Sequence, residues 1–212
     1  MRKLQLATIL ILILVTNILS AQTKYNFTVQ FTFEGIVEGS KTQFSVFLEP
    51  KSGTWLLTKD DTFLSKVDDI KQWVLKPNGD IIMVGDGEFA NSPEIIKVKN
   101  HAVKKSPLKL QSKVAGKAIR YGKNKYGWPS YLATPYNLNI GRMTQKSFLA
   151  KTNYNFSPLY AYNFCLDIEN YLPAFSKINY CEAIPHNYLV SEDSEVKLIS
   201  VSPTEYFLEL PK

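Results

Sequence analysis

The chain has very little of the material from which metal sites and cysteine-based catalysts are made. Its 212 residues include only two cysteines and two histidines, which leaves almost no ligands for a structural zinc site. The motifs of several common enzyme classes are also absent: the nucleophile elbow, the two-histidine zinc helix, the phosphate-binding glycine loop and paired CxxC motifs. We therefore predict no catalytic residue, no metal and no cofactor, and favour a protein that is not an enzyme.

Acidic residues are missing from the middle of the chain. Residues 95–166 contain 13 lysines and arginines and no aspartate or glutamate. The flanking segments are acidic, with net charges of −4 over residues 22–94 and −5 over residues 167–212. Such a basic block either presents a face to anionic partners or solubilises a sheet and blocks edge-to-edge pairing of its strands.

Lysine outnumbers arginine 11 to 2 in this basic block. Recognition of phosphates and bases prefers the arginine fork, so the solubilising role is favoured, an anionic envelope surface is a candidate partner, and no nucleic acid is expected. The residues that would contact an anionic surface are Lys104, Lys105, Lys109, Lys113, Lys117, Arg120, Lys123 and Lys125.

The N-terminus has the pattern of a secretory signal peptide. Basic residues at positions 2 and 3 precede an almost wholly apolar run over residues 4–19, and a small-residue junction follows at Ser20-Ala21. The uninterrupted apolar core, residues 9–15, is short against the roughly 20 residues that span a bilayer. We predict that residues 1–21 are cleaved and that the mature protein is periplasmic or secreted, without a transmembrane anchor.

The mature chain reads as one β-rich domain over residues 22–212. Aromatic and polar residues alternate from Tyr25 to Glu34, which predicts a strand with one buried face. Turn sequences at residues 49–53 and 76–80 separate apolar segments and predict two hairpins. We predict a mainly β fold, an antiparallel meander that forms a curved sheet or incomplete barrel with one or two short helices.

Other segments are less regular. Over residues 108–118 the apolar spacing fits either a helix or a strand. Pro107 and Gly116 argue against a helix, so we expect a strand with its leucines and Val114 facing inward and the lysines outward; the leucines are Leu108 and Leu110. Residues 121–158 are rich in Gly, Pro and Asn and predict loop with short strands inside it. A short helix is expected over residues 167–175, and closing strands over residues 188–190, 196–201 and 206–210.

Carboxylate pairs and the two cysteines leave alternatives open. Asp60-Asp61, Asp68-Asp69 and Asp86-Gly87-Glu88 adjoin predicted turns, where aspartate is favoured for local hydrogen bonding. The alternatives are a pair such as Asp86 and Glu88 that hydrolyses glycan, and carboxylate oxygens that bind calcium. Export favours a disulfide between Cys165 and Cys181. The alternative for the cysteines is two buried free thiols.

Three stretches resemble the outer-membrane lipoprotein carrier (LolA-like) superfamily and neighbouring uncharacterised exported families. Residues 27–35 resemble the first aromatic strand of these proteins, residues 46–55 the turn after the second strand, and residues 198–211 the closing strand. The resemblance implies an antiparallel sheet curved around one or two helices. Its concave apolar face would accept an acyl chain or another hydrophobic ligand.

The leading functional prediction is an exported, non-enzymatic protein that binds a hydrophobic or amphipathic ligand, such as an acylated envelope molecule, in a half-barrel. The side chains predicted to line the ligand face are Phe27, Phe31, Phe33 and Trp55. Two alternatives remain: a cell-envelope glycan hydrolase that uses a carboxylate pair, and an interaction module that docks its lysine-rich face on an anionic surface polymer.

Overall fold

A computed structural model describes the greater part of the mature chain. The residues described are 23–37, 40–58, 70–85, 94–97, 107–110, 112–124, 130–140, 143–162 and 180–210. The predicted signal peptide, the carboxylates at positions 60, 61, 68, 69, 86 and 88, and the predicted helix over residues 167–175 lie outside them. Within these ranges, none of the helices has the length and apolar character needed to cross a membrane.

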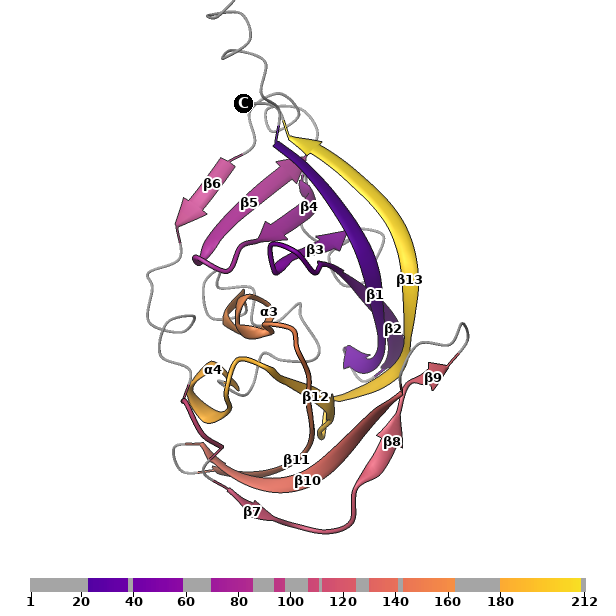
Figure 1. Ribbon diagram of the computed structural model, residues 1–212, viewed down its shortest axis with the longest axis vertical. Helices are drawn as coiled ribbons and strands as arrows, with labels where there is room; N and C mark the ends of the chain where they lie inside the picture. Colours follow the sequence, from indigo (N-terminus) through magenta and orange to yellow (C-terminus); the bar gives the residue numbers. More distant parts are fainter. Residues whose placement is uncertain are drawn as a thin grey trace, which may run out of the picture.

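The fold is mainly β, as predicted, and its strands curve around two short helices (Figure 1). The helices within the described residues are α3 (Ser157–Tyr162) and α4 (Tyr180–Ala183). The strands are β1 (Thr23–Val37), β2 (Ser40–Glu49), β3 (Thr54–Thr58), β4 (Ile70–Leu75), β5 (Asp80–Gly85), β6 (Glu94–Lys97), β7 (Lys113–Val114), β8 (Ile119–Tyr121), β9 (Lys123–Asn124), β10 (Tyr131–Ile140), β11 (Met143–Lys151), β12 (Tyr188–Glu192) and β13 (Val196–Leu210).

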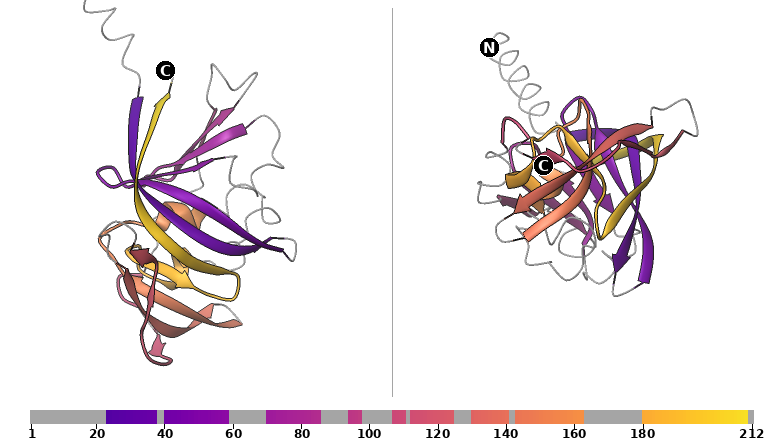
Figure 2. Two further views of the ribbon diagram at one scale, coloured as in Figure 1. Left: turned by 90° about the vertical axis from the view of Figure 1, so that its right-hand side faces the viewer. Right: turned by 90° about the horizontal axis from the view of Figure 1, so that it is seen from below.

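The strands form one sheet that is not closed into a barrel. Its order is β6-β5-β4-β3-β2-β1-β13-β12-β11-β10-β7, and β8 pairs with β10 while β9 pairs with β13. The neighbours along this path are antiparallel, and β9 runs parallel to β13. The sheet bends so that β3–β5 and β10–β11 lie on opposite sides of the helices (Figures 1 and 2). The curved antiparallel meander is therefore confirmed.

Both predicted hairpins are confirmed. β2 pairs with β3 and β4 pairs with β5, each across the predicted turn. Gly53 adopts a φ of 71° in the first turn, and its N–H donates to Glu49 O at 2.9 Å. Only glycine adopts this left-handed conformation without strain. Turn chemistry and alternation together fix the register of these strands.

β1 and β13, of 15 residues each, line two separate cores. Val29, Phe31 and Phe33 face the main core. Tyr25 and Phe27 continue the same alternation but join a second core, because this end of β1 extends beyond its pairing with β2, which begins at Val29. The overhanging end covers the opposite face of β3, β4 and β5, so those strands are buried on both sides. The second core consists of Tyr25, Phe27, Leu56, Val74, Ile82, Leu208 and Leu210.

The prediction of loop over residues 121–158 is wrong for its larger part. β10 and β11 form a long hairpin that pairs from Ile140 and Met143 outward to Thr134 and Leu149. Pro135 obscures the strand pattern, since proline is rare inside sheets. It is tolerated because it lies between the stretches of β10 that pair with β8 and with β7.

The prediction of a buried strand face over residues 108–118 is also wrong. Of the residues described between 108 and 118, Lys113 and Val114 form the strand β7, whose two ladder pairs are with β10. Leu108 is 97% exposed and Val114 62% exposed, although Leu110 is partly buried against the main core. The alternation gave the spacing of a strand, but among the described residues no element covers Leu108, and its side chain faces solvent.

Candidate ligand-binding groove

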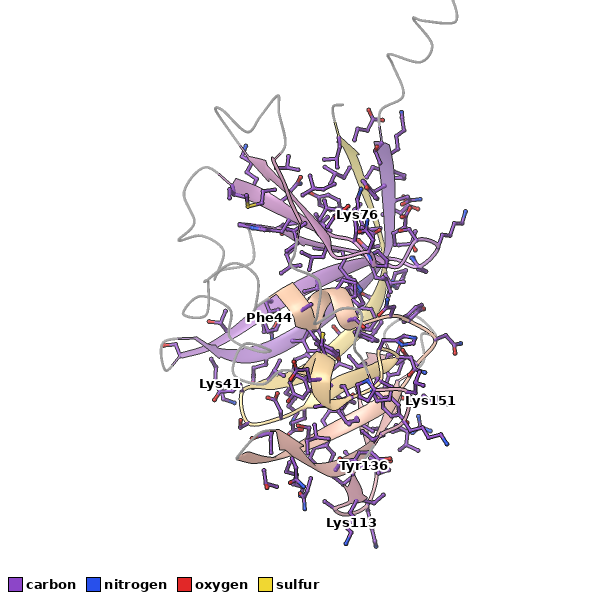
Figure 3. All side chains as sticks on the ribbon, turned by 90° about the vertical axis from the view of Figure 1, so that its left-hand side faces the viewer. Lys41, Phe44, Lys76, Lys113, Tyr136 and Lys151 are labelled. Atoms are coloured by element: carbon purple, nitrogen blue, oxygen red, sulfur yellow. The ribbon has the colours of Figure 1, made fainter. Side chains whose placement is uncertain are left out.

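A groove of about 530 Å³ opens at the end of the molecule where β7 and β10 lie. Its lining comes from distant parts of the chain: β7 and the segment before it, strand β10, the end of β11, and β12 with the segment that joins it to α4. In Figure 3, Tyr136 and Lys151 lie in this lower half of the molecule, and Lys113 lies at its tip. The lining residues are Leu108, Lys109, Leu110, Ser112, Val114, Tyr136, Lys151, Pro185, Asn187 and Tyr188.

Two strand pairings hold the groove in shape. Tyr136 of β10 lies opposite Val114 of β7, and Lys151 of β11 lies opposite Tyr188 of β12. Tyr160 of α3 fixes the wall that β12 forms. Its hydroxyl donates a hydrogen bond to Tyr188 O at 2.9 Å and accepts one from Val190 N at 2.8 Å. The groove walls are therefore fixed by backbone ladders and by a buried tyrosine.

The apolar part of the groove is open to solvent. Leu108 and Val114 are two of the most exposed large hydrophobic side chains in the described part of the protein. Leu110, Tyr136 and Tyr188 add partly buried apolar surface that is continuous with the main core. Exposed apolar side chains that adjoin one another in a hollow are typical of binding sites.

The charged part of the groove is basic. Lys109 and Lys151 are exposed. Neither lysine forms an ion pair with a described residue. The described residues of the lining include no carboxylate or histidine, and most of them come from the acid-free block. Among the described lining residues, an anionic group would therefore meet two ammonium groups that have no ion-pair partner and no negatively charged side chain that repels it.

The four aromatic residues predicted to line a ligand face lie in the interior. Phe27, Phe31, Phe33 and Trp55 are each 0% exposed. Phe31, Phe33 and Trp55 share the main core, whereas Phe27 belongs to the second core. The concave side is occupied by the α3 region: Phe156 packs on Phe31 at 5.7 Å and on Trp55 at 5.0 Å between ring centroids.

The predicted anionic-surface residues lie mainly at the groove end of the molecule. Lys109, Lys113, Lys117 and Arg120 are exposed there, on the segment that contains β7 and β8. Lys123 is described only as backbone within β9. Lys104, Lys105 and Lys125 lie outside the described residues.

The predicted disulfide is not decided. Cys165 lies outside the described residues, whereas Cys181 is buried in α4 with its sulfur 3.3 Å from Ser157 O. The pairing therefore stays a prediction.

A second, smaller hollow of about 220 Å³ lies beside the turn between β12 and β13. Asp193 organises this turn: Oδ1 accepts from Glu195 N at 2.7 Å and from Val196 N at 2.8 Å, and Oδ2 accepts from the Tyr180 hydroxyl at 2.5 Å. Burial raises the pKa of the Asp193 carboxyl above its usual value, although these donors act in the opposite direction. These hydrogen bonds join α4 to the turn between β12 and β13, so the residues beside this hollow stabilise the fold.

Sequence reasoning missed Tyr136, Tyr188 and Lys151 as groove residues. They lie on strands that come together only in the folded sheet. The available signal was the lack of any acid over residues 95–166, which placed Lys151 in the same basic block as Lys109.

Comparisons with known proteins add no relatives. No protein-family model matches the chain, and no curated protein or solved structure matches it. The resemblance to the lipoprotein carrier superfamily stays a prediction.

Proposed function

We propose that this protein is an exported binding protein whose groove holds an amphipathic ligand, an acyl chain with an anionic head group. The observation that carries the proposal is one hollow in which exposed Leu108 and Val114 lie with unpaired Lys109 and Lys151. An acyl chain would remove water from the two apolar side chains, and the lysines would donate charge-assisted hydrogen bonds to the head group.

The size of the groove agrees with this ligand class. Its volume of about 530 Å³ falls inside the range of about 300–1,000 Å³ that is usual for small-molecule sites. Burial of about ten methylene groups contributes about 8 kcal/mol and the two charge-assisted hydrogen bonds about 3 kcal/mol together, of which about 5 kcal/mol offsets the translational and rotational freedom lost on binding. We therefore expect a Kd of about 10–100 µM for a single-chain ligand.

Two further observations support binding over catalysis and support an envelope ligand. Among the lining residues that the structure describes, Ser112 offers a hydroxyl, but no carboxylate or histidine accompanies it as a general base. The N-terminal sequence has the pattern of an export signal, and acylated anionic molecules are components of the cell envelope. A carrier or sensor of such a molecule would need the hollow and its two cations but no reactive group.

The test is titration of the purified mature protein with a fluorescent fatty acid. Leu108→Asp should weaken binding about tenfold, because it removes apolar contact and places a negative charge beside the head group. It should leave the free energy of unfolding unchanged, since Leu108 is 97% exposed. Lys151→Glu should weaken binding by a similar factor. The affinity of this variant should also fall less with rising ionic strength than that of the wild type, because one attractive charge is lost.

Matched controls come from other exposed residues, which lie outside the groove. Phe207→Asp introduces the same carboxylate at a 68% exposed apolar side chain on β13. Lys146→Glu reverses a charge on the same strand as Lys151. Both controls should bind the probe like the wild type. Loss of affinity equal to that of the groove variants, or no saturable binding of the probe by the wild-type protein, would refute the proposal.

A further inference from the structure

Most of the exposed large hydrophobic side chains in the described part of the protein lie at one end. Within the described residues, five large hydrophobic side chains are exposed. Four of them lie in the segment before β7, in β7, in β8 and in the facing strand β10: Leu108, Val114, Ile119 and Leu132. Only Phe207 lies elsewhere. Ile119 and Leu132, 49% and 55% exposed, do not line the groove, so a ligand held there leaves them uncovered.

Cations alternate with these apolar side chains. Over residues 113–120 every side chain is exposed except Ala115, which is half-buried, and the sequence is Lys-Val-Ala-Gly-Lys-Ala-Ile-Arg. Lys113, Lys117 and Arg120 carry the charge, and no acidic residue occurs between positions 95 and 166. Arg120 is anchored to Ser130, to whose hydroxyl it donates at 3.1 Å.

The segment forms an edge of the sheet and not a flat face. Leu132 lies opposite Arg120 and Ala133 lies opposite Ile119, so Leu132 and Ile119 project from opposite sides of the β8–β10 pair. Both sides therefore carry an apolar side chain at the same edge. Figure 1 places β7 and β8 at the end of the molecule farthest from the C-terminus. β7 is the last strand in the order of the described sheet, so this edge is available to a large surface.

We propose that this edge docks on an anionic lipid bilayer, with Ile119 and Leu132 entering the head-group region and Lys113, Lys117 and Arg120 pairing with lipid phosphates. Isolated apolar side chains between cations suit a bilayer interface, where each side chain buries itself separately and lysine stems lie along the apolar boundary. A polyanionic glycan would be attracted by the cations alone and would leave Ile119 and Leu132 in water. Docking at head-group depth also keeps the unpaired backbone groups of the edge hydrated.

The proposal is tested by co-sedimentation of the full mature protein with vesicles, without the fatty-acid probe. Binding is expected to vesicles that contain phosphatidylglycerol, to weaken with salt, and to be at least tenfold weaker to phosphatidylcholine alone. The double variant Lys117→Glu/Arg120→Glu should lose about tenfold or more in vesicle affinity. Ile119→Asp and Leu132→Asp should each lose several-fold, since their apolar contact with the interface is removed.

The controls separate docking from ligand binding and from unfolding. Lys51→Glu and Phe207→Asp change an exposed cation and an exposed aromatic away from the edge and should bind vesicles like the wild type. The edge variants should still bind the fatty-acid probe, because none of the changed residues lines the groove. Equal losses in the edge variants and the controls would overturn docking by this edge. Binding to heparin without binding to anionic vesicles would overturn the lipid assignment.

Discussion

Replacement of Phe31 by alanine should decide whether the aromatic side chains of β1 form the core or serve a ligand. Phe31 is 0% exposed and contacts four rings, with centroid distances of 5.5 Å to Trp55, 6.4 Å to Tyr131, 6.2 Å to Tyr154 and 5.7 Å to Phe156. These rings come from β3, from β10 and from the approach to α3. Phe31 therefore joins β1 to two other strands of the sheet and to the aromatic residues before α3, which lie on the concave side.

The expected loss of stability follows from this environment. Truncation of a buried phenylalanine to alanine costs about 3–5 kcal/mol, through lost apolar transfer and the cavity left behind. The four ring contacts place Phe31→Ala at the upper part of this range, about 4 kcal/mol. With a urea m-value of about 2–3 kcal/mol/M, the unfolding midpoint should fall by about 1.5 M.

The assay is urea unfolding followed by tryptophan fluorescence, with Trp55 beside the changed site. Probe affinity in the groove should be unchanged at urea concentrations where the variant is folded, since Phe31 does not line the groove. A loss below about 1 kcal/mol together with weaker probe binding would refute the reasoning, because Phe31 would then serve the ligand and not the core. Phe31→Asp should prevent folding, because a buried unpaired carboxylate is strongly unfavourable.

Two further predictions concern the buried turn and the cysteines. The raised pKa of Asp193 means that the folded state holds this proton at pH values where the unfolded state has released it, so stability should fall as the pH rises above 3.8 through the raised pKa. Asp193→Asn should remove this decline, measured as the difference in unfolding free energy between variant and wild type across pH; an unchanged difference would contradict the assignment. Thiol labelling of unreduced, denatured protein should find no reactive group if Cys165 and Cys181 are bridged, and two labelled thiols per chain would end that prediction. Closure of a loop of about 16 residues contributes about 3 kcal/mol, so reduction should lower the melting temperature without unfolding the protein.

The local pattern of the sequence determined the first half of the sheet. Alternation from Tyr25 to Phe33 and the turn residues before Gly53 and Gly79 specify β1 to β5, because both signals act between neighbouring residues. Composition also fixed the basic character of the groove, since residues 95–166 contain no acid.

Only the tertiary structure decided which apolar residues are buried. Tyr25 and Phe31 share one strand face and one pattern, yet they enter different cores because β1 extends beyond the end of β2. Leu108 and Leu110 show the same strand spacing, yet Leu108 is 97% exposed while Leu110 packs on the core. Alternation assigns side chains to faces, but burial depends on whether a distant segment covers that face, and this is set by long-range packing that no local signal encodes.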